Sequence, residues 1–350
     1  MSKTVIKELL IIGAGPAGLK AAQEAEERGI DYLVLEKGEN GQSWKEIRPD
    51  LPMLSPCHPQ RDWTSLSNQF PIWKMDIKRP YCSSAEFCNY LDAFSDHFKL
   101  KIETQCEVQE INHDGEQFVL HTRGKAVYKA PILLVATGIF GNPFIPNVSG
   151  IQDNPYVMHS HHYRSADDFK GQCVLVVGAG NSAAETAIDL TRTAMVYLVS
   201  RKDLQYFADT QKLYHIRGVS ESFLKELIKM ELVRYRAHQE IQHIEGDTVY
   251  FKDWKLQTHK IIFATGYHGH IDVVKNFKLR VNKGNYPEVS YSGESIQFPN
   301  LFFGGPLSFQ NTASIVIHGF IKHLPITMDR IQEKLTSERM QARPLDKEGS

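Results

Sequence analysis

The sequence contains few cysteines, and their spacing excludes two common roles. Their number is odd and no CxxC occurs among the five, Cys57, Cys82, Cys88, Cys106 and Cys173. A disulfide framework and a thioredoxin-type redox pair are therefore not indicated. Reduced and mostly buried thiols are the simpler interpretation, and they are typical of a cytoplasmic protein.

The sequence also lacks an excess of charge and a long apolar run. Lys and Arg number 40 and Asp and Glu number 41, so no strong field attracts nucleic acid or an anionic membrane. The apolar run near the N-terminus is too short for a membrane span, and a glycine turn follows it in place of a cleavage site. We expect a cytoplasmic protein that binds neither nucleic acid nor membrane.

A glycine-rich turn near the N-terminus is the first functional signal. The apolar run Leu9–Ile12 predicts a buried strand, and Gly13, Gly15 and Gly18 then form GxGxxG. Such glycines let the backbone turn tightly and approach a pyrophosphate at a helix N-terminus. Glu36 ends the next apolar run, where a carboxylate accepts hydrogen bonds from ribose hydroxyls. The stretch predicts a dinucleotide site.

The same pattern returns in the middle of the chain. Cys173–Val177 predicts a strand, a GxGxxA turn begins at Gly178, and Arg201 stands where the first copy has Glu36. An acid favours an unphosphorylated ribose, whereas Arg201, with Lys202 beside it, suits a 2′-phosphate. The first site is therefore expected to bind FAD, with NAD as the alternative, and the second NADPH. The competing interpretation is that Arg201 and Lys202 are solvated surface charges.

Each glycine turn is followed by strand-like segments and then by Ala-Thr-Gly, at residues 136–138 and 264–266. This duplication predicts an α/β fold with two Rossmann-like, three-layer domains, each with an antiparallel β-meander. We expect the second domain, residues 166–267, to bind NADPH and to be inserted into the FAD-binding domain of residues 1–165 and 268–350. We also predict helices over residues 84–98 and 220–236, a helix starting near Thr312 whose dipole faces the flavin, and a frayed tail beyond about Thr336.

Residues 37–80 lose regular periodicity and are rich in Pro, Ser and Trp. The three tryptophans Trp44, Trp63 and Trp73 argue against disorder, so we expect this segment to wrap over a bound ligand. Cys57 in this segment is either a redox thiol or, more simply, a small side chain that lines a pocket, because no resolving partner can be named.

These features together resemble the two-dinucleotide-domain flavoproteins (GR2-type Rossmann folds), and most closely the flavin-containing monooxygenases of the short bacterial single-chain type. The resemblance covers nearly the whole chain. It rests on Gly41-Gln42-Ser43-Trp44, His159 and Tyr163 at H-x3-Y spacing, Phe169-Lys170-Gly171, Gly178-Ala179-Gly180-Asn181-Ser182 and Ala264-Thr265-Gly266-Tyr267.

The resemblance implies that NADPH reduces FAD and that the reduced flavin captures O2 as a C4a-(hydro)peroxide. One oxygen atom then passes to a small soft nucleophile, namely a sulfide or an amine, with a ketone as a further substrate class. One departure concerns Leu54, which stands where larger members have an asparagine near the flavin. Leucine donates no hydrogen bond, and this leaves open a shorter-lived peroxyflavin or no useful oxygenation.

The alternative is an NADPH-dependent flavoprotein reductase of a disulfide, quinone or carrier protein. A bacillithiol-type reductase would have a cysteine within the first glycine motif, where this chain has Ala17. A non-enzymatic redox-sensing or interaction protein would leave the second nucleotide motif without a role.

The predicted FAD residues are Gly13, Gly15, Pro16, Ala17, Gly18, Glu36, Lys37, Gln42, Ser43, Trp44, Thr137, Gly138 and Thr312. The predicted NADPH residues are Gly178, Gly180, Asn181, Ser182, Ser200, Arg201, Lys202, Thr265, Gly266 and Tyr267. No catalytic residue is assigned, and the flavin-face candidates are Leu54, Cys57 and Asn311. His159, His161 and His162 lack a Cys or carboxylate at ligand spacing, so no metal is expected. The expected partners are a small-molecule substrate and O2, and the expected assembly is a monomer or homodimer.

Overall fold

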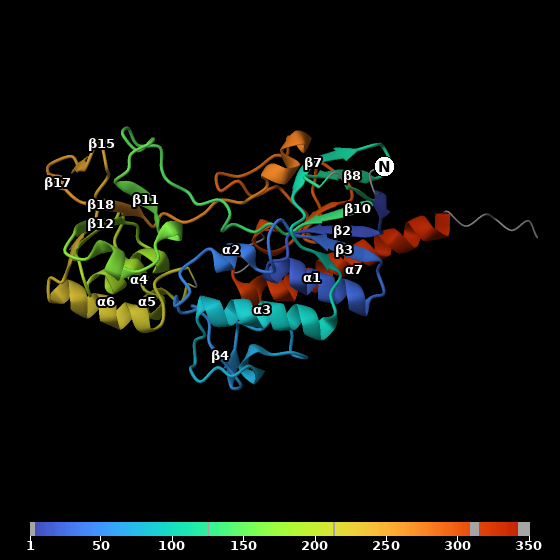
Figure 1. Cartoon of the computed structure of the whole chain (residues 1–350), viewed down its shortest axis with the longest axis horizontal. Coiled ribbons are helices and arrows are strands. Elements are labelled where there is room, and N and C mark those ends of the chain that lie inside the picture. The colour runs from blue at the N-terminus through green and yellow to red at the C-terminus, as the bar shows by residue number, and fades with distance from the viewer. Residues whose placement is uncertain (1–3, 125, 213, 309–314, 342–350) are drawn as a thin grey trace, which may run out of the picture.

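Two five-stranded parallel sheets form the centres of two lobes (Figure 1). The structure is a computed structural model that describes residues 4–124, 126–212, 214–308 and 315–341. Within these residues no helix is both long enough and apolar enough to cross a membrane.

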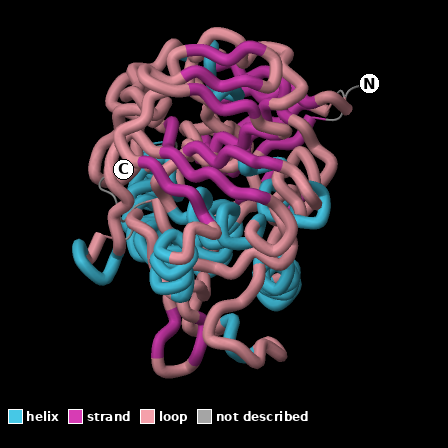
Figure 2. The backbone as a smooth tube through the Cα atoms, turned by 90° about the vertical axis from the view of Figure 1, so that its left-hand side faces the viewer, coloured by secondary structure: helices cyan, strands magenta, loops and turns pink. Residues whose placement is uncertain are grey.

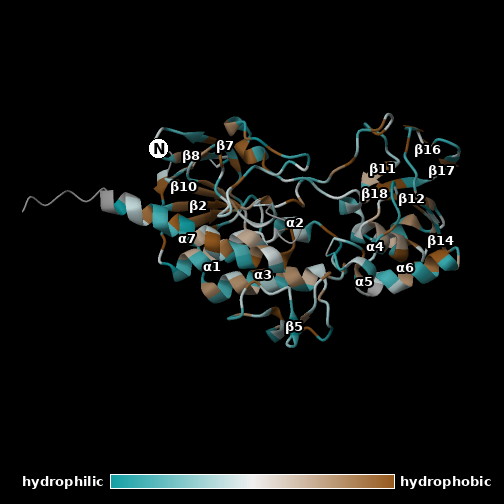
Figure 3. Ribbon diagram, turned by 180° about the vertical axis from the view of Figure 1, so that it is seen from behind, coloured by the Kyte–Doolittle hydropathy of each residue, from teal (hydrophilic) through white to brown (hydrophobic). Residues whose placement is uncertain are grey.

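The first sheet has all five strands parallel. Its order is β19 (Leu301–Phe303), β10 (Ile132–Val135), β2 (Leu9–Ile12), β3 (Tyr32–Leu35) and β6 (Ile102–Glu103). Side chains alternate across it: Leu9 and Ile11 pack with the helices, while Leu10 and Ile12 pack on the opposite face. The strand is therefore apolar on both faces, as in Figure 3, which colours β2 and β10 brown.

Three helices cover one face of this sheet, namely α1 (Pro16–Glu27), α3 (Ser84–Phe98) and α7 (Ile317–Gln341) (Figure 1). The predicted bounds of α3 are correct. Ser83 and Glu86 form a capping box that begins this helix. The predicted helix start near Thr312 lies outside the described residues, and α7 extends past residue 336, where a tail was expected.

A four-stranded sheet covers the other face. Its order is β1 (Thr4–Ile6), β9 (Val127–Ala130), β8 (Phe118–Thr122) and β7 (Val108–His113). β7, β8 and β9 form the expected antiparallel meander, and β1 joins it by parallel pairing with β9, which was not anticipated. Figure 2 shows the strand layers and the helices as separate layers.

The second sheet is also parallel throughout. Its order is β11 (Val157–His159), β18 (Lys260–Phe263), β12 (Cys173–Val177), β13 (Met195–Val199) and β14 (Val233–Arg236). Its helices are α4 (Asn181–Leu190), α5 (Phe207–Thr210) and α6 (Val219–Lys229). A small antiparallel sheet accompanies it, formed by β15 (His243–Glu245), β16 (Thr248–Tyr250) and β17 (Lys255–Gln257).

The prediction of one helix over residues 220–236 is wrong at its C-terminal end. Glu231 adopts a left-handed φ of 58°, and the Leu232 N–H donates to the Leu227 carbonyl oxygen at 3.0 Å. This geometry closes a helix, so the chain turns into β14.

The two lobes are not consecutive along the chain. β10 pairs with β19, although the whole second sheet lies between them in sequence. β11 belongs to the second sheet but precedes residue 166, the predicted start of the second domain. The prediction had assigned the residues of β11 to the first domain, so the structure does not establish residue 166 as the boundary, and the domain bounds stay a prediction.

The segment of residues 37–80 divides into two parts. Its first part contains α2 (Gln42–Lys45) and lines the cavity described below. Its second part forms a hairpin of β4 (Cys57–His58) and β5 (Arg61–Asp62), which projects beyond α3 (Figures 1 and 2), and a short turn η1 (Ile72–Lys74). Only the first part fits the expectation of a ligand-covering loop.

Candidate functional site

A cavity of about 1760 Å³ lies between the lobes and is lined by both glycine turns. Sites for one small molecule usually measure about 300–1,000 Å³. The cavity is therefore large enough to hold more than one ligand, and it brings both predicted dinucleotide sites into one space.

Each of the three positions in the first turn favours glycine for a different structural reason. Gly13 adopts a φ of 101°, which favours glycine. A Cβ on Gly18 would lie 1.8 Å from the Gly13 carbonyl oxygen, so this position holds α1 against β2. A Cβ on Gly15 would meet nothing within 4 Å, because Gly15 opens onto the cavity.

The start of α1 is suited to an anion. Gly15 is its N-cap and provides no side-chain hydrogen bond to the helix, while Pro16 occupies the first turn. The first N–H groups of such a helix are free to bind phosphate oxygens. The open space at Gly15 thus fits a pyrophosphate.

Glu36 is held rigidly at the cavity wall. It is 6% exposed, and its two oxygens accept hydrogen bonds from the Ala14 N–H at 2.7 Å and from the Gly38 N–H at 2.9 Å. Each carboxylate oxygen has a second lone pair. The carboxylate therefore fits a ribose whose hydroxyl groups act as donors.

The second turn repeats the geometry of the first. A Cβ on Gly178 would lie 2.3 Å from the Ala264 carbonyl oxygen, and Gly180 has nothing within 4 Å and caps α4 without a side-chain bond. Arg201 and Lys202 follow the end of β13 after Ser200, are exposed and line the cavity. This donor set fits a phosphorylated dinucleotide.

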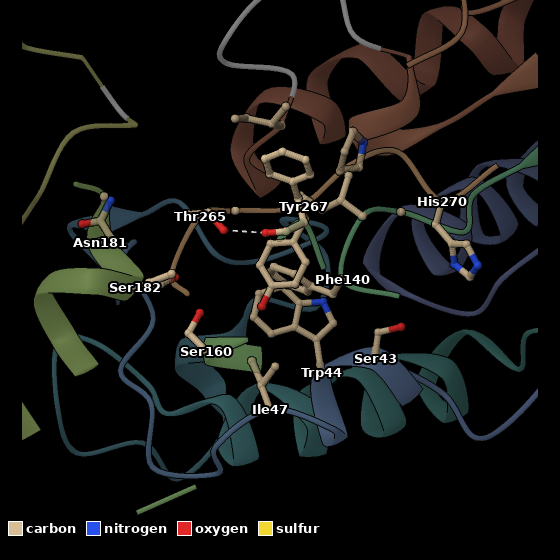
Figure 4. A pocket seen from close by; sticks show the side chains of 18 of the residues that line it. Ser43, Trp44, Ile47, Phe140, Ser160, Asn181, Ser182, Thr265, Tyr267 and His270 are labelled. Atoms are coloured by element: carbon tan, nitrogen blue, oxygen red, sulfur yellow. Dashed lines mark hydrogen bonds between the residues drawn. The ribbon is translucent and has the colours of Figure 1, made fainter. Parts of the chain in front are cut away.

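A row of aromatic side chains runs across the cavity. The ring of Trp44 lies 4.8 Å from that of Phe140, which lies 4.9 Å from that of Tyr267. Figure 4 shows these rings between Asn181 and Ser182 on one side and Ser43 on the other. Burial raises the pKa of Tyr267 to about 12, so its hydroxyl keeps its proton near neutral pH.

His159 connects β11 to the second Ala-Thr-Gly turn. Its Nε2 donates to the Gly266 carbonyl oxygen at 3.0 Å, and its Nδ1 accepts from the His161 N–H at 3.0 Å. Burial lowers the pKa of His159 to about 4. His159 is therefore a neutral positioning residue beside Tyr267, whose ring lies 5.1 Å away.

The structure brings nearly all predicted cofactor residues to this cavity. Gly18 lies behind the turn and does not line it, and Thr312 and Asn311 lie outside the described residues. Leu54 lines the cavity. The prediction for Cys57 is corrected: it is buried in the β4–β5 hairpin, where its thiol donates to the Pro80 carbonyl oxygen at 3.3 Å, and it does not line the cavity.

Sequence reasoning missed a group of buried charged residues between the lobes. Arg48 of the first lobe forms an ion pair at 2.9 Å with Asp189 of α4, which also accepts a hydrogen bond from Tyr163 at 2.7 Å. Burial raises the pKa of Glu185 to about 8, and Arg217 lines the same region. Two members had a sequence signal nearby: Glu185 follows the second glycine motif by two residues, and Tyr163 belongs to the H-x3-Y pattern.

A family model described as pyridine nucleotide-disulphide oxidoreductase matches residues 10–305. The probable indole-3-pyruvate monooxygenase YUCCA1 of Arabidopsis thaliana is 32% identical over 203 residues, covering 55% of this chain and 46% of that protein. The chain spans about half the length of the first relatives that it matches, 46% and 56%.

Two solved structures share the fold over most of the chain. The bacillithiol disulfide reductase of Staphylococcus aureus has a TM-score of 0.82 at 24% identity, covering 95% of this chain and 99% of that one. The flavin-containing monooxygenase of Stenotrophomonas maltophilia has a TM-score of 0.82 at 19% identity, covering 94% and 99%. At such identities the likeness shows the fold alone, which is the α/β fold of two-dinucleotide-binding flavoproteins.

Proposed function

We infer the function from the premise that the chain belongs to the pyridine nucleotide-disulphide oxidoreductase family and is therefore an oxidoreductase. We propose that it is an FAD-dependent, NADPH-using monooxygenase. Its substrate would be a small sulfide, amine or ketone, and its co-substrate would be O2.

The observation that carries the proposal is the single cavity joined to two helix N-termini of the same geometry. One dinucleotide at each N-terminus would place both reactive rings near the aromatic row of Trp44, Phe140 and Tyr267. When bound, NADPH would supply the hydride and FAD would accept it and react with O2, while the protein would bind and orient both groups and exclude water. The Arabidopsis relative is a probable monooxygenase, which supports the oxygenase assignment.

The residues of this chain have separate roles in the proposal. The N–H groups after Gly15 would bind the FAD pyrophosphate, and Glu36 would accept hydrogen bonds from its ribose. The corresponding N–H groups after Gly180 would bind the NADPH pyrophosphate, and Arg201 with Lys202 its 2′-phosphate. Tyr267 and Phe140 would shield the reacting region from water.

An isotope experiment tests the oxygenase step. The holoprotein is supplied with NADPH, ¹⁸O₂ and a test sulfide, and the sulfoxide is analysed by mass spectrometry. We expect label in the product in proportion to the NADPH consumed. Consumption of NADPH with release of hydrogen peroxide and no labelled sulfoxide would contradict the proposal.

A reductase is the second candidate, and the side chain of Leu54 is the observation that favours it. Leu54 is half-buried at the cavity and donates no hydrogen bond that could stabilise an oxygen adduct. The fold shared with a bacillithiol disulfide reductase is compatible with this function. Rapid anaerobic reduction of a quinone or disulfide by NADPH, without oxygen insertion, would favour this candidate.

A further inference from the structure

Arg217 presents to the cavity a guanidinium group that has no partner among the described residues. The residue is 5% exposed and lines the cavity, and its Nε is buried without a hydrogen-bond partner. Among the residues that the structure describes, its side chain forms neither a hydrogen bond nor a salt bridge. A buried charge without a partner is costly, so a ligand that supplies an anion would be bound strongly.

Arg48 provides the contrast within the same cavity. It is also buried and its Nε likewise makes no hydrogen bond, but its guanidinium forms ion pairs with Asp189 at 2.9 Å and with Asp50 at 3.0 Å. Arg48 therefore has a structural role between the lobes. Arg217 has no such role in the described residues.

Glu185 does not neutralise Arg217. Glu185 and Arg217 interact electrostatically, but burial raises the pKa of Glu185 to about 8, so most of its carboxyl groups carry a proton at neutral pH. Burial lowers the pKa of Arg217, and Tyr81 and Glu185 only partly oppose this effect. A guanidinium remains charged in proteins, so the cavity retains an uncompensated positive charge at this point.

Two hydrogen bonds to Asn181 hold the backbone around Arg217 at the start of α4. The Arg217 N–H donates to Asn181 Oδ1 at 2.9 Å, and Asn181 Nδ2 donates to the His215 carbonyl oxygen at 3.1 Å. Asn181 starts α4 and lies at the edge of the cavity in Figure 4. The charge of Arg217 acts on Tyr81 and His318, and both belong to the first lobe.

We propose that Arg217 binds an anionic oxygen group, the carboxylate of the organic substrate, within the cavity. This inference rests on the proposed function, because it assigns the substrate to the cavity that would hold both cofactors. The enzyme would then prefer small substrates that carry both a soft nucleophile and a carboxylate. A planar guanidinium binds a carboxylate through two parallel hydrogen bonds.

A guanidinium could equally bind the pyrophosphate of the nucleotide, so the test distinguishes the substrate carboxylate from the nucleotide pyrophosphate. Oxidised holoprotein is titrated with 3-(methylthio)propionate and with its neutral amide, and binding is followed by calorimetry or the flavin absorbance. We expect the carboxylate to bind about tenfold or more tightly than the amide. NADP⁺ is titrated in parallel.

Arg217→Met should remove the preference for the carboxylate while NADP⁺ affinity stays within about twofold. Arg217→Lys should retain part of the preference, because it keeps the charge but not the two-pronged geometry. Arg123→Met, at an exposed turn of the meander, is the matched control for loss of one positive charge. Flavin content and melting temperature report whether each variant is folded.

Equal binding of carboxylate and amide by the unmodified protein would overturn the inference, even if Arg217→Met failed to fold. Loss of NADP⁺ affinity in Arg217→Met with an unchanged carboxylate preference would also overturn it, and would assign the charge to the nucleotide. These titrations need neither NADPH turnover nor O2. A failed oxygen-insertion assay with an intact carboxylate preference would therefore reject the monooxygenase proposal alone.

Discussion

The neutral form of His159 is built into the structure, so we predict that acid destabilises the fold through this side chain. The imidazole is 2% exposed, donates from Nε2 to Gly266 and accepts at Nδ1 from the His161 N–H. A second proton would have to enter at Nδ1, where it would oppose that N–H. Burial and this geometry both disfavour the imidazolium.

The sign and size of the effect follow from linkage. The folded pKa of about 4 lies below the reference value of 6.5, so between these values the unfolded chain binds more protons than the folded chain. The stability that neutral His159 contributes is present above about pH 6.5 and is lost as the pH falls towards 4. At about pH 5 the loss amounts to roughly 2 kcal/mol.

Urea unfolding of wild type and His159→Gln at about pH 7 and pH 5 measures this loss. Glutamine can donate from its amide nitrogen to Gly266, but its amide oxygen does not lie where Nδ1 accepts from the His161 N–H, so the variant should be less stable by about 1–3 kcal/mol at neutral pH. The difference in unfolding free energy between wild type and variant should narrow by about 2 kcal/mol at the lower pH. His121→Gln, on the exposed face of β8, is the matched control. A gap that is equal at both pH values would refute the reasoning.

Three further predictions concern the glycine turns, the basic pair and the contact between the lobes. Gly18→Ala should lower the melting temperature because the new Cβ would meet the Gly13 carbonyl oxygen. Gly15→Ala should fold normally but bind FAD at least about tenfold more weakly, as measured by flavin release. Arg201→Ala should erase a preference for NADPH over NADH in anaerobic flavin reduction, and equal use of both by the wild type would remove this assignment. Asp189→Ala should lower the free energy of unfolding by about 3–5 kcal/mol, because it leaves the buried Arg48 with only the exposed Asp50 as partner. A decrease below about 1 kcal/mol would show that the ion pair is dispensable.

The parts of the fold that were predictable depend on neighbours along the chain. α3 begins with a capping box formed by Ser83 and Glu86, which are three residues apart in sequence. The strand and glycine turn around Gly13 were readable for the same reason. α6 was predicted too long because its end depends on a left-handed residue, Glu231, that is not a glycine and gives no sequence signal.

The placement of Cys57 shows where local reasoning stops. The segment that contains it was predicted to face the flavin as a whole. After Ser55 the chain leaves the cavity and forms a hairpin beyond α3. Such a turn of direction is set by packing against distant helices, and no short-range pattern encodes it.

The sequence by itself determined that the chain carries two glycine turns of the dinucleotide-binding type. It also determined that an acidic residue, Glu36, follows the first turn and that two basic residues, Arg201 and Lys202, follow the second. Each is a local signature, because a tight turn, a helix N-terminus and the residue after the next strand are fixed within one strand–helix–strand unit. Only the tertiary structure decided that both turns open onto one cavity, that Arg48 is paired across the lobes and that Arg217 has no partner among the described residues. The burial and partners of a charge depend on segments far apart in the chain, so they exist only once the chain has folded.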